Sequence, residues 1–73
     1  MSVEQNVYVY MMNNYAYHVD PSCNVLNLTH LAEDAAEEFN LYEDEIDFVI
    51  PEWVFDLAYD IDKVLIQRGI CQQ

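Results

Sequence analysis

Residues 27–40 carry the clearest periodic pattern of hydrophobic and polar positions in the chain. Apolar side chains recur at alternating spacings of three and four residues, which places them on one face of an α-helix. Asn27 or Thr29 could accept the first backbone N–H bonds of this helix, and Asn40 suits a left-handed position at its end. The apolar face consists of Leu28, Leu31, Ala32, Ala35 and Phe39, and the acids Glu33, Asp34, Glu37 and Glu38 lie opposite it.

A further helix is predicted from Pro51 to Arg68. Proline fits the first helical position, where an N–H group would have no partner in any case, and Gly69 is typical of a helix stop. The expected core stripe consists of Trp53, Leu57, Ile61, Val64 and Leu65. A second apolar strip lies on roughly the opposite side, where the preceding helix, a second copy of the chain or a target protein could cover it. This strip consists of Phe55, Tyr59 and Ile66.

The first third of the chain fits two structures. β-Branched and aromatic residues on both sides of Asn13-Asn14 allow a β-hairpin over residues 7–19. A helix over residues 4–18 is the competing structure, and Ser2 and Gln5 have the spacing of a capping box at its start. We favour the helix, because an isolated two-stranded ribbon is weakly stable whereas three helices can share one core. The inner face of this helix would consist of Val7, Met11, Tyr15 and His18.

Residues 1–73 are therefore predicted to form a single acidic helical domain, an all-α three-helix bundle. The alternative that stays open is an α+β fold in which an N-terminal β-hairpin packs on two helices. In either fold, residues 41–50 link the last two helices. We expect the apolar residues of this link, Ile46, Phe48 and Ile50, to pack against the core.

Negative charge is concentrated in the middle of the chain. Fourteen Asp and Glu stand against two Lys and Arg, which gives a net charge of -12. Two of the fourteen acids, Glu4 and Asp20, come early, so the other twelve fall between Glu33 and Asp62, where no Lys or Arg occurs. Acidic helix faces usually serve solubility. Like-charge pairs one helical turn apart cost stability, however, and their repetition here indicates a binding role.

The acidic stretch predicts a surface that attracts a basic protein. Carboxylates one helical turn apart, about 6 Å along the axis, can present charge at separations comparable with those of backbone phosphates. We therefore expect an inhibitor or decoy that occupies the basic nucleic-acid-binding surface of a larger protein and does not itself bind nucleic acid. The residues expected to bind this partner are Glu33, Asp34, Glu37, Glu38, Glu43, Asp44, Glu45, Asp47, Glu52, Asp56 and Asp60, together with Phe55 and Tyr59.

In size and charge the chain resembles the small acidic anti-defence proteins of phages and mobile elements, which include DNA mimics of the anti-restriction and anti-CRISPR types. The resemblance covers length, acidity and the shortage of basic residues. It involves no sequence motif, so it assigns no role to any single residue. It implies that the protein inhibits a nucleic-acid-binding complex in the cytoplasm of a host cell.

A helical adaptor or small subunit is the second hypothesis, in which the strip of Phe55, Tyr59 and Ile66 binds a protein partner and the charge serves solubility. The chain has no catalytic motif, and the acidic run at residues 43–47 lacks calcium-loop spacing, so we expect no enzyme activity, metal or other cofactor. The absence of a long apolar run predicts no membrane association, and the two cysteines lack zinc spacing. We expect a cytoplasmic protein with reduced thiols and a surplus of apolar residues that allows a homodimer.

Overall fold

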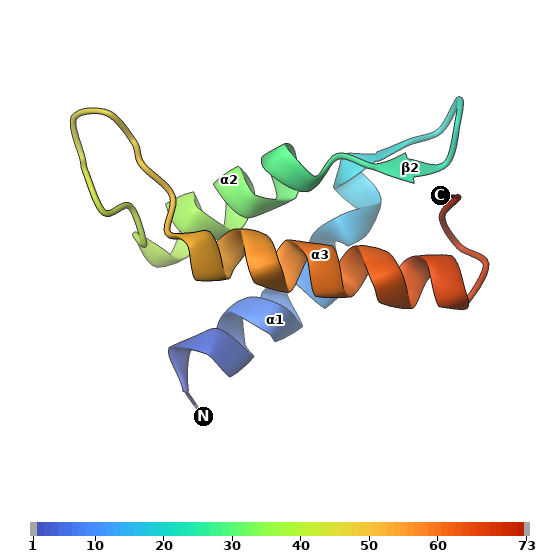
Figure 1. The fold of residues 1–73 in the computed structure, drawn as a ribbon, viewed down its shortest axis with the longest axis horizontal. Coiled ribbons are helices and arrows are strands. Elements are labelled where there is room, and N and C mark those ends of the chain that lie inside the picture. The colour runs from blue at the N-terminus through green and yellow to red at the C-terminus, as the bar shows by residue number, and fades with distance from the viewer. Residues whose placement is uncertain (1, 73) are drawn as a thin grey trace.

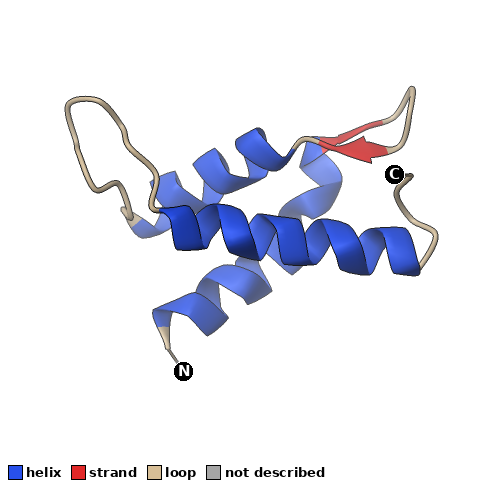
Figure 2. Ribbon diagram, in the orientation of Figure 1, coloured by secondary structure: helices blue, strands red, loops and turns tan. Residues whose placement is uncertain are grey.

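Three helices make up most of the protein, and a short β-hairpin joins the first helix to the second (Figure 1). The computed structural model describes residues 2–72. The helices are α1 (Val3–Asn14), α2 (Leu28–Phe39) and α3 (Glu52–Gln67), and the hairpin strands are β1 (Val19–Asp20) and β2 (Val25–Leu26). Figure 2 shows the hairpin as the one departure from helix and loop within this part of the chain. The expected helices are present, and a mixed α+β description fits the chain as well as a pure bundle does.

The N-terminal helix α1 is fixed at its start by a capping box. The Ser2 hydroxyl accepts a hydrogen bond from the Gln5 backbone N–H at 3.2 Å, and the Gln5 side-chain oxygen accepts one from the Ser2 backbone N–H at 3.1 Å. These two bonds satisfy donors that a helix start leaves free. Val7 and Met11 face inward and are fully buried, as predicted. The hairpin expected to turn at Asn13-Asn14 does not form, because residues 7–14 belong to α1 and residues 15–18 to a 3-10 turn.

The hairpin lies further along the chain than the sequence indicated. A 3-10 turn, η1 (Tyr15–His18), continues α1, and β1 then pairs antiparallel with β2. The Asp20 backbone oxygen accepts a hydrogen bond from the Asn24 N–H at 2.7 Å, and Asn24 has a positive φ of 54°. Asn tolerates this left-handed conformation better than most residues, so it suits the turn.

The second helix, α2, begins and ends as its sequence predicts. The Asn27 side chain accepts a hydrogen bond from the His30 N–H at 3.1 Å, which makes Asn27 the N-cap. Asn40 adopts the left-handed conformation at the end, with a φ of 52°. Four side chains of its inner face are buried, and three of these are alanines, which leave room for the neighbouring helix to approach closely. The buried residues are Leu31, Ala32, Ala35 and Ala36.

The third helix, α3, is turned slightly about its axis relative to the prediction. Pro51 is the N-cap rather than the first helical residue. Trp53 and Leu57, expected in the core, are half-buried, and their sequence neighbours Val54 and Ala58 are buried instead. Ile61 and Leu65 are buried as expected, and Gly69 has the positive φ of a helix stop, 74°. In the second apolar strip, Phe55 and Ile66 pack against the core, whereas Tyr59 is 54% exposed.

The two ends of the molecule are built from different segments (Figure 1). Helices α2 and α3 run antiparallel, and α1 starts below α3 and passes behind it in this view. One end, at the left, holds the loop of residues 40–51. The other end holds the hairpin and the C-terminal segment, where the Gln72 N–H donates to the Asn24 carbonyl at 2.8 Å and the Cys71 side chain is buried.

The loop between α2 and α3 corrects one prediction. Ile46, Phe48 and Ile50 were expected against the core, but Ile46 is 87% exposed and Phe48 is 65% exposed. Only Ile50 packs against the buried cluster. The core is already filled by residues of the three helices and the hairpin, and the loop extends beyond the helix ends, so its middle finds no apolar neighbour to cover it (Figure 1).

Candidate functional site

One of the acids in the predicted partner-binding set, Asp34, forms hydrogen bonds inside the fold. One of its carboxylate oxygens accepts from the Tyr10 hydroxyl at 2.7 Å, and the other lies 2.8 Å from His18 Nε2. The hydrogen bond to Asp34, together with burial and the negative charge of Asp34, raises the pKa of Tyr10 to about 12. The rings of Tyr10 and Phe39 also pack in a T-shaped arrangement, with their centroids 5.5 Å apart. Asp34 therefore ties α2 to α1 and η1.

Most of the other acids lie where α2 ends, the loop crosses and α3 begins, whereas Glu33 and Asp60 lie further along α2 and α3. We call this region the acidic end. Helices α2 and α3 are antiparallel, so the last turn of one and the first turns of the other lie at the same end of the molecule, beside the loop (Figure 1). All of its acids are exposed except Asp44, which is half-buried. The acidic end consists of Glu37, Glu38, Glu43, Asp44, Glu45, Asp47, Glu52 and Asp56.

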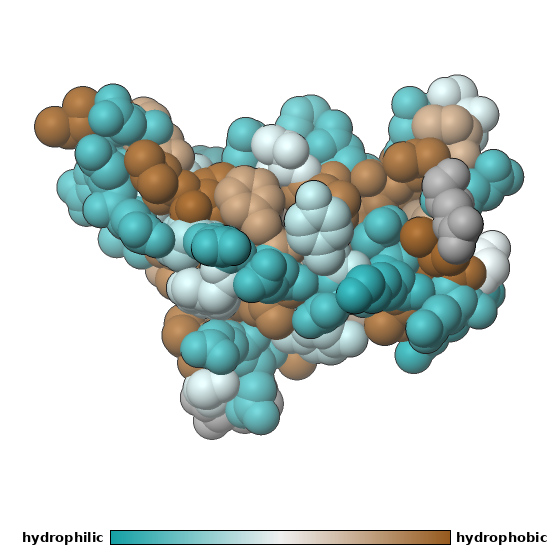
Figure 3. Space-filling view, in the orientation of Figure 1, coloured by the Kyte–Doolittle hydropathy of each residue, from teal (hydrophilic) through white to brown (hydrophobic). Residues whose placement is uncertain are grey.

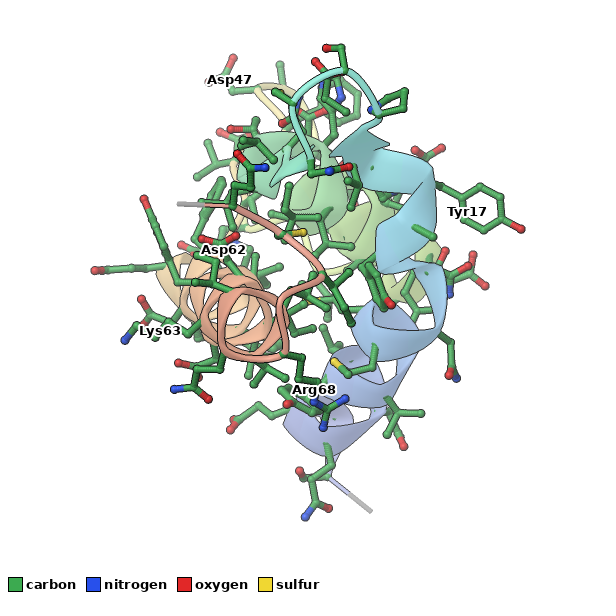
Figure 4. The ribbon with its side chains drawn as sticks, turned by 90° about the vertical axis from the view of Figure 1, so that its right-hand side faces the viewer. Tyr17, Asp47, Asp62, Lys63 and Arg68 are labelled. Carbon is green, nitrogen blue, oxygen red and sulfur yellow. The ribbon has the colours of Figure 1, made fainter. Side chains whose placement is uncertain are left out.

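Both basic residues lie toward the opposite end of the molecule. Figure 4 looks along α3 from its carboxyl end, and Lys63 and Arg68 lie in this near part, whereas Asp47 belongs to the loop at the far end. The longest dimension of the molecule is 35 Å. Within residues 2–72, the pair of His18 and Asp34 is the only contact between an acidic and a basic side chain within 4.0 Å. The exposed carboxylates of the acidic end thus have no Lys or Arg partner in the described chain.

The two helical rows of carboxylates do not form one flat surface. Glu33 and Glu37 are exposed on the outer side of α2, and Glu52, Asp56 and Asp60 are exposed on the outer side of α3. Helices that share a core turn their outer sides away from one another, so the two rows point in different directions. They approach each other only at the acidic end, where the loop carries its own acids. Charge is therefore densest at this end rather than along the whole of both helices.

An apolar feature of the acidic end was missed from the sequence. The loop carries three exposed hydrophobic side chains, Ile46, Phe48 and Val49, of which the last is 46% exposed. We call them the apolar tip. Figure 3 shows hydrophobic atoms at the extremity of this loop, at the upper left, next to hydrophilic ones. One sequence feature could have indicated this turn. An Asp side chain, here Asp44, can accept hydrogen bonds from the backbone N–H groups two and three residues later and so cap a turn.

Two surface hollows have no residue of the acidic end in their lining. One, of about 550 Å³, is open to solvent and lies between the start of α1 and Leu57, with Glu4 as its one carboxylate. Another, of about 350 Å³, lies beside the hairpin and includes Tyr15 and Ile70. In residues 2–72, no group of three or more His, Cys, Asp or Glu is arranged to hold a metal ion. The exposed carboxylates of the acidic end attract positive charge.

Two further observations bear on the remaining expectations. Over residues 2–72, no helix is both long and apolar enough to cross a membrane. Cys23 is exposed and Cys71 is buried, and both thiols are free. Burial, with a smaller contribution from the charge of Asp62, raises the pKa of the Cys71 thiol. Comparison with known proteins finds no matching family, no similar curated protein and no matching solved structure.

Proposed function

We propose that the protein is an acidic decoy that places its acidic end on the basic nucleic-acid-binding surface of another protein. The observation that carries this proposal is the set of exposed carboxylates that have no Lys or Arg partner within residues 2–72. An unpaired anionic surface raises the rate of encounter with basic surfaces and repels nucleic acid. The partner is therefore a basic protein, and the inhibited activity is its binding of DNA or RNA.

The spacing of the carboxylates at the acidic end supports the proposal that this end imitates a nucleic acid. Glu52 and Asp56 follow one another by one helical turn, about 6 Å along the axis, and the loop adds further carboxylates beside them. A nucleic-acid-binding groove is lined by Lys and Arg that contact successive phosphates. Such a groove can pair with several carboxylates at once. The anti-defence proteins that the chain resembles in size and charge occupy surfaces of this kind.

The experiment that tests the proposal is capture of partners from a cell lysate with the immobilised protein. We expect the retained proteins to be basic nucleic-acid-binding proteins, released both by raised salt and by added duplex DNA, because screening and competition act on the same contacts. Retention that persists unchanged in high salt contradicts the proposal. Formation of a ternary complex, in which a captured protein binds DNA and the decoy together, contradicts it as well.

Two matched charge variants separate the acidic end from net charge in general. The first carries Glu45→Gln, Asp47→Asn and Glu52→Gln, which remove three charges at the acidic end. The second carries Glu4→Gln, Asp20→Asn and Asp62→Asn, which remove three charges at acids outside the expected partner-binding set. Affinity for a captured partner should fall much more for the first variant than for the second. Equal losses would show that only the total charge of the protein matters.

Under the adaptor hypothesis, the apolar strip on α3 offers one exposed side chain to a partner. Of the apolar strip on α3, Phe55 and Ile66 pack against the core, so Tyr59 is the one side chain of the strip that a partner could bury extensively. Tyr59→Asp should abolish binding if the adaptor hypothesis is right, and neutralising Glu37 and Glu38 should then have little effect. The decoy proposal expects the reverse result.

A further inference from the structure

The apolar tip is the most exposed cluster of large hydrophobic side chains in the loop between α2 and α3. Ile46 is 87% exposed, Phe48 65% and Val49 46%. A single exposed hydrophobic residue is ordinary on a protein surface. Here three of them lie within four consecutive positions, in a segment whose other residues are mostly acidic. Apolar side chains gathered in this way, with polar groups around them, are typical of an interaction surface.

The loop that carries the tip is held in shape by its own hydrogen bonds. The Glu43 N–H donates to the Val49 carbonyl at 2.8 Å, and the Val49 N–H donates to the Asp44 carbonyl at 3.2 Å, which closes the loop at its base. The Asp44 side chain accepts from the backbone N–H groups of Ile46 at 2.8 Å and Asp47 at 3.2 Å. The tip is therefore presented in a defined conformation before any partner binds, which lowers the entropy cost of binding.

The backbone at Phe48 adds a second indication. Phe48 has a positive φ of 53°, a left-handed conformation that costs about 1–3 kcal/mol for residues other than glycine. The Phe48 ring meets the edge of the Tyr42 ring at a centroid distance of 5.3 Å, yet most of the Phe48 side chain stays in water. Asn or Gly would suit this backbone better. The contact with Tyr42 leaves most of the Phe48 ring free to contact a partner.

We propose that the apolar tip inserts into an apolar patch bordered by Lys and Arg side chains on the partner. The exposed carboxylates of Glu45 and Asp47 flank Ile46 along the loop, and the exposed carboxylate of Glu43 precedes them. They select a patch with a basic border, because a desolvated carboxylate needs a cationic or hydrogen-bonding partner. A second copy of this chain does not fit, since it would bring the same carboxylates together at a net charge of -12 per chain. This inference rests on the proposed function and names its anchor.

Two synthetic helical peptides of equal charge provide the probe. One has Leu along one face and Lys on both sides of it, which presents an apolar strip with a basic border. In the other, every Leu is replaced by Ala and the Lys residues are unchanged. Calorimetric titration should show that the protein binds the Leu peptide about tenfold more tightly, equivalent to about 1.4 kcal/mol, because only that peptide can bury the tip.

Substitutions in the tip test where this preference arises. Ile46→Ser combined with Phe48→Asn should reduce affinity for the Leu peptide to that for the Ala peptide and leave the latter unchanged. Asn at position 48 tolerates the left-handed backbone, so the loop should keep its shape. Tyr17→Ser is the matched control, since Tyr17 is 83% exposed and points away from the bundle on the side opposite α3 (Figure 4). The control should keep the tenfold preference.

The outcomes separate the tip from the decoy proposal. Equal affinity of the unmodified protein for both peptides, or a preference that survives the double substitution, overturns the role of the tip and leaves the decoy proposal standing. Binding of the Leu peptide through the tip without any binding of the Ala peptide overturns the decoy proposal and leaves the tip standing. Self-association that Ile46→Ser abolishes, measured by sedimentation, would instead identify a second copy as the occupant and overturn the inference.

Discussion

Asp34 and Glu38 lie one turn apart on α2, and the structure uses their carboxylates differently. Asp34 accepts a hydrogen bond from Tyr10 and contacts His18, so its negative charge holds α1 and η1 against α2. Glu38 is exposed and has no such donor. The difference comes from their neighbours rather than from their residue type, because α1 passes beside the first carboxylate and supplies donors. An acid-rich segment thus contains both structural carboxylates and free ones.

The same contrast holds for the two ends of the molecule. At the hairpin end, the C-terminal segment is tied to the hairpin turn by the bond between Gln72 and Asn24, and apolar Cys71 is buried. At the acidic end, the middle of the loop is closed by hydrogen bonds among Glu43, Asp44 and Val49, and Ile46, Phe48 and Val49 face water. Groups at the first end contribute to the stability of the fold. The exposed side chains at the second end contribute little to it, so a partner can bind them without disturbing the core.

The largest expected difference lies between Asp34→Ala and Glu38→Ala. Removing Asp34 leaves the Tyr10 hydroxyl and His18 without their acceptor, and we expect the free energy of unfolding to fall by about 2 kcal/mol. Glu38→Ala removes an exposed side chain and should change the free energy of unfolding by less than about 0.5 kcal/mol. Urea denaturation followed by circular dichroism measures both. Similar losses in the two variants would contradict the structural role of Asp34.

The pH dependence of stability sharpens the same comparison. The pKa of Tyr10 is about 12 in the folded protein against 10.0 for the free side chain, and the hydrogen bond to Asp34 is the largest cause. Because the folded value is the higher one, this contribution to stability is complete below pH 10 and is lost as pH rises toward 12. Carbon NMR of the tyrosine rings should show one late titration, assigned by Tyr10→Phe. Asp34→Asn should move that titration to lower pH.

How far the sequence leads can be judged from these same residues. The periodic pattern predicted α2 and its caps correctly, because helix faces and capping groups depend on residues within a few positions of one another. The capping box of Ser2 and Gln5 likewise decided the structure of the first segment. The contact of Asp34 with Tyr10 could not be predicted, since it joins positions 24 residues apart and depends on how α1 and α2 pack.

In the loop between α2 and α3, the sequence did not predict which apolar residues are buried. The apolar residues Ile46, Phe48 and Ile50 were expected to pack against the core, and this expectation was wrong for the first two. The Asp44 side chain instead caps a turn, and Phe48 adopts a positive φ that no sequence pattern indicates for an aromatic residue. Whether an apolar residue is buried depends on the space left in the core, which only the packed helices determine.

A matched pair of isoleucines in this loop gives the next effect in size. Ile50→Ala should lower the free energy of unfolding by about 1–2 kcal/mol, because Ile50 is half-buried and packs against the core. Ile46→Ala should change it by less than about 0.5 kcal/mol, since Ile46 is 87% exposed. Thermal unfolding of both variants measures the difference. A large loss of unfolding free energy for Ile46→Ala would show that this side chain stabilises the fold. That result would contradict the binding role of the apolar tip.

The smallest effect concerns the electrostatic cost of the acidic end. Glu37 lies in the last turn of α2, where the carboxyl end of the helix dipole disfavours a negative charge, and it follows Glu33 by one turn. Glu37→Lys should therefore raise the free energy of unfolding by about 0.3–1 kcal/mol. Glu52→Lys, in the first turn of α3, should lower it by a similar amount, because the dipole there favours an acid. Both shifts should shrink as salt is added.

Since both substitutions remove charge from the acidic end, both should weaken partner binding although their effects on stability have opposite signs. Partner binding that follows stability instead would mean that the acids of this end serve the fold.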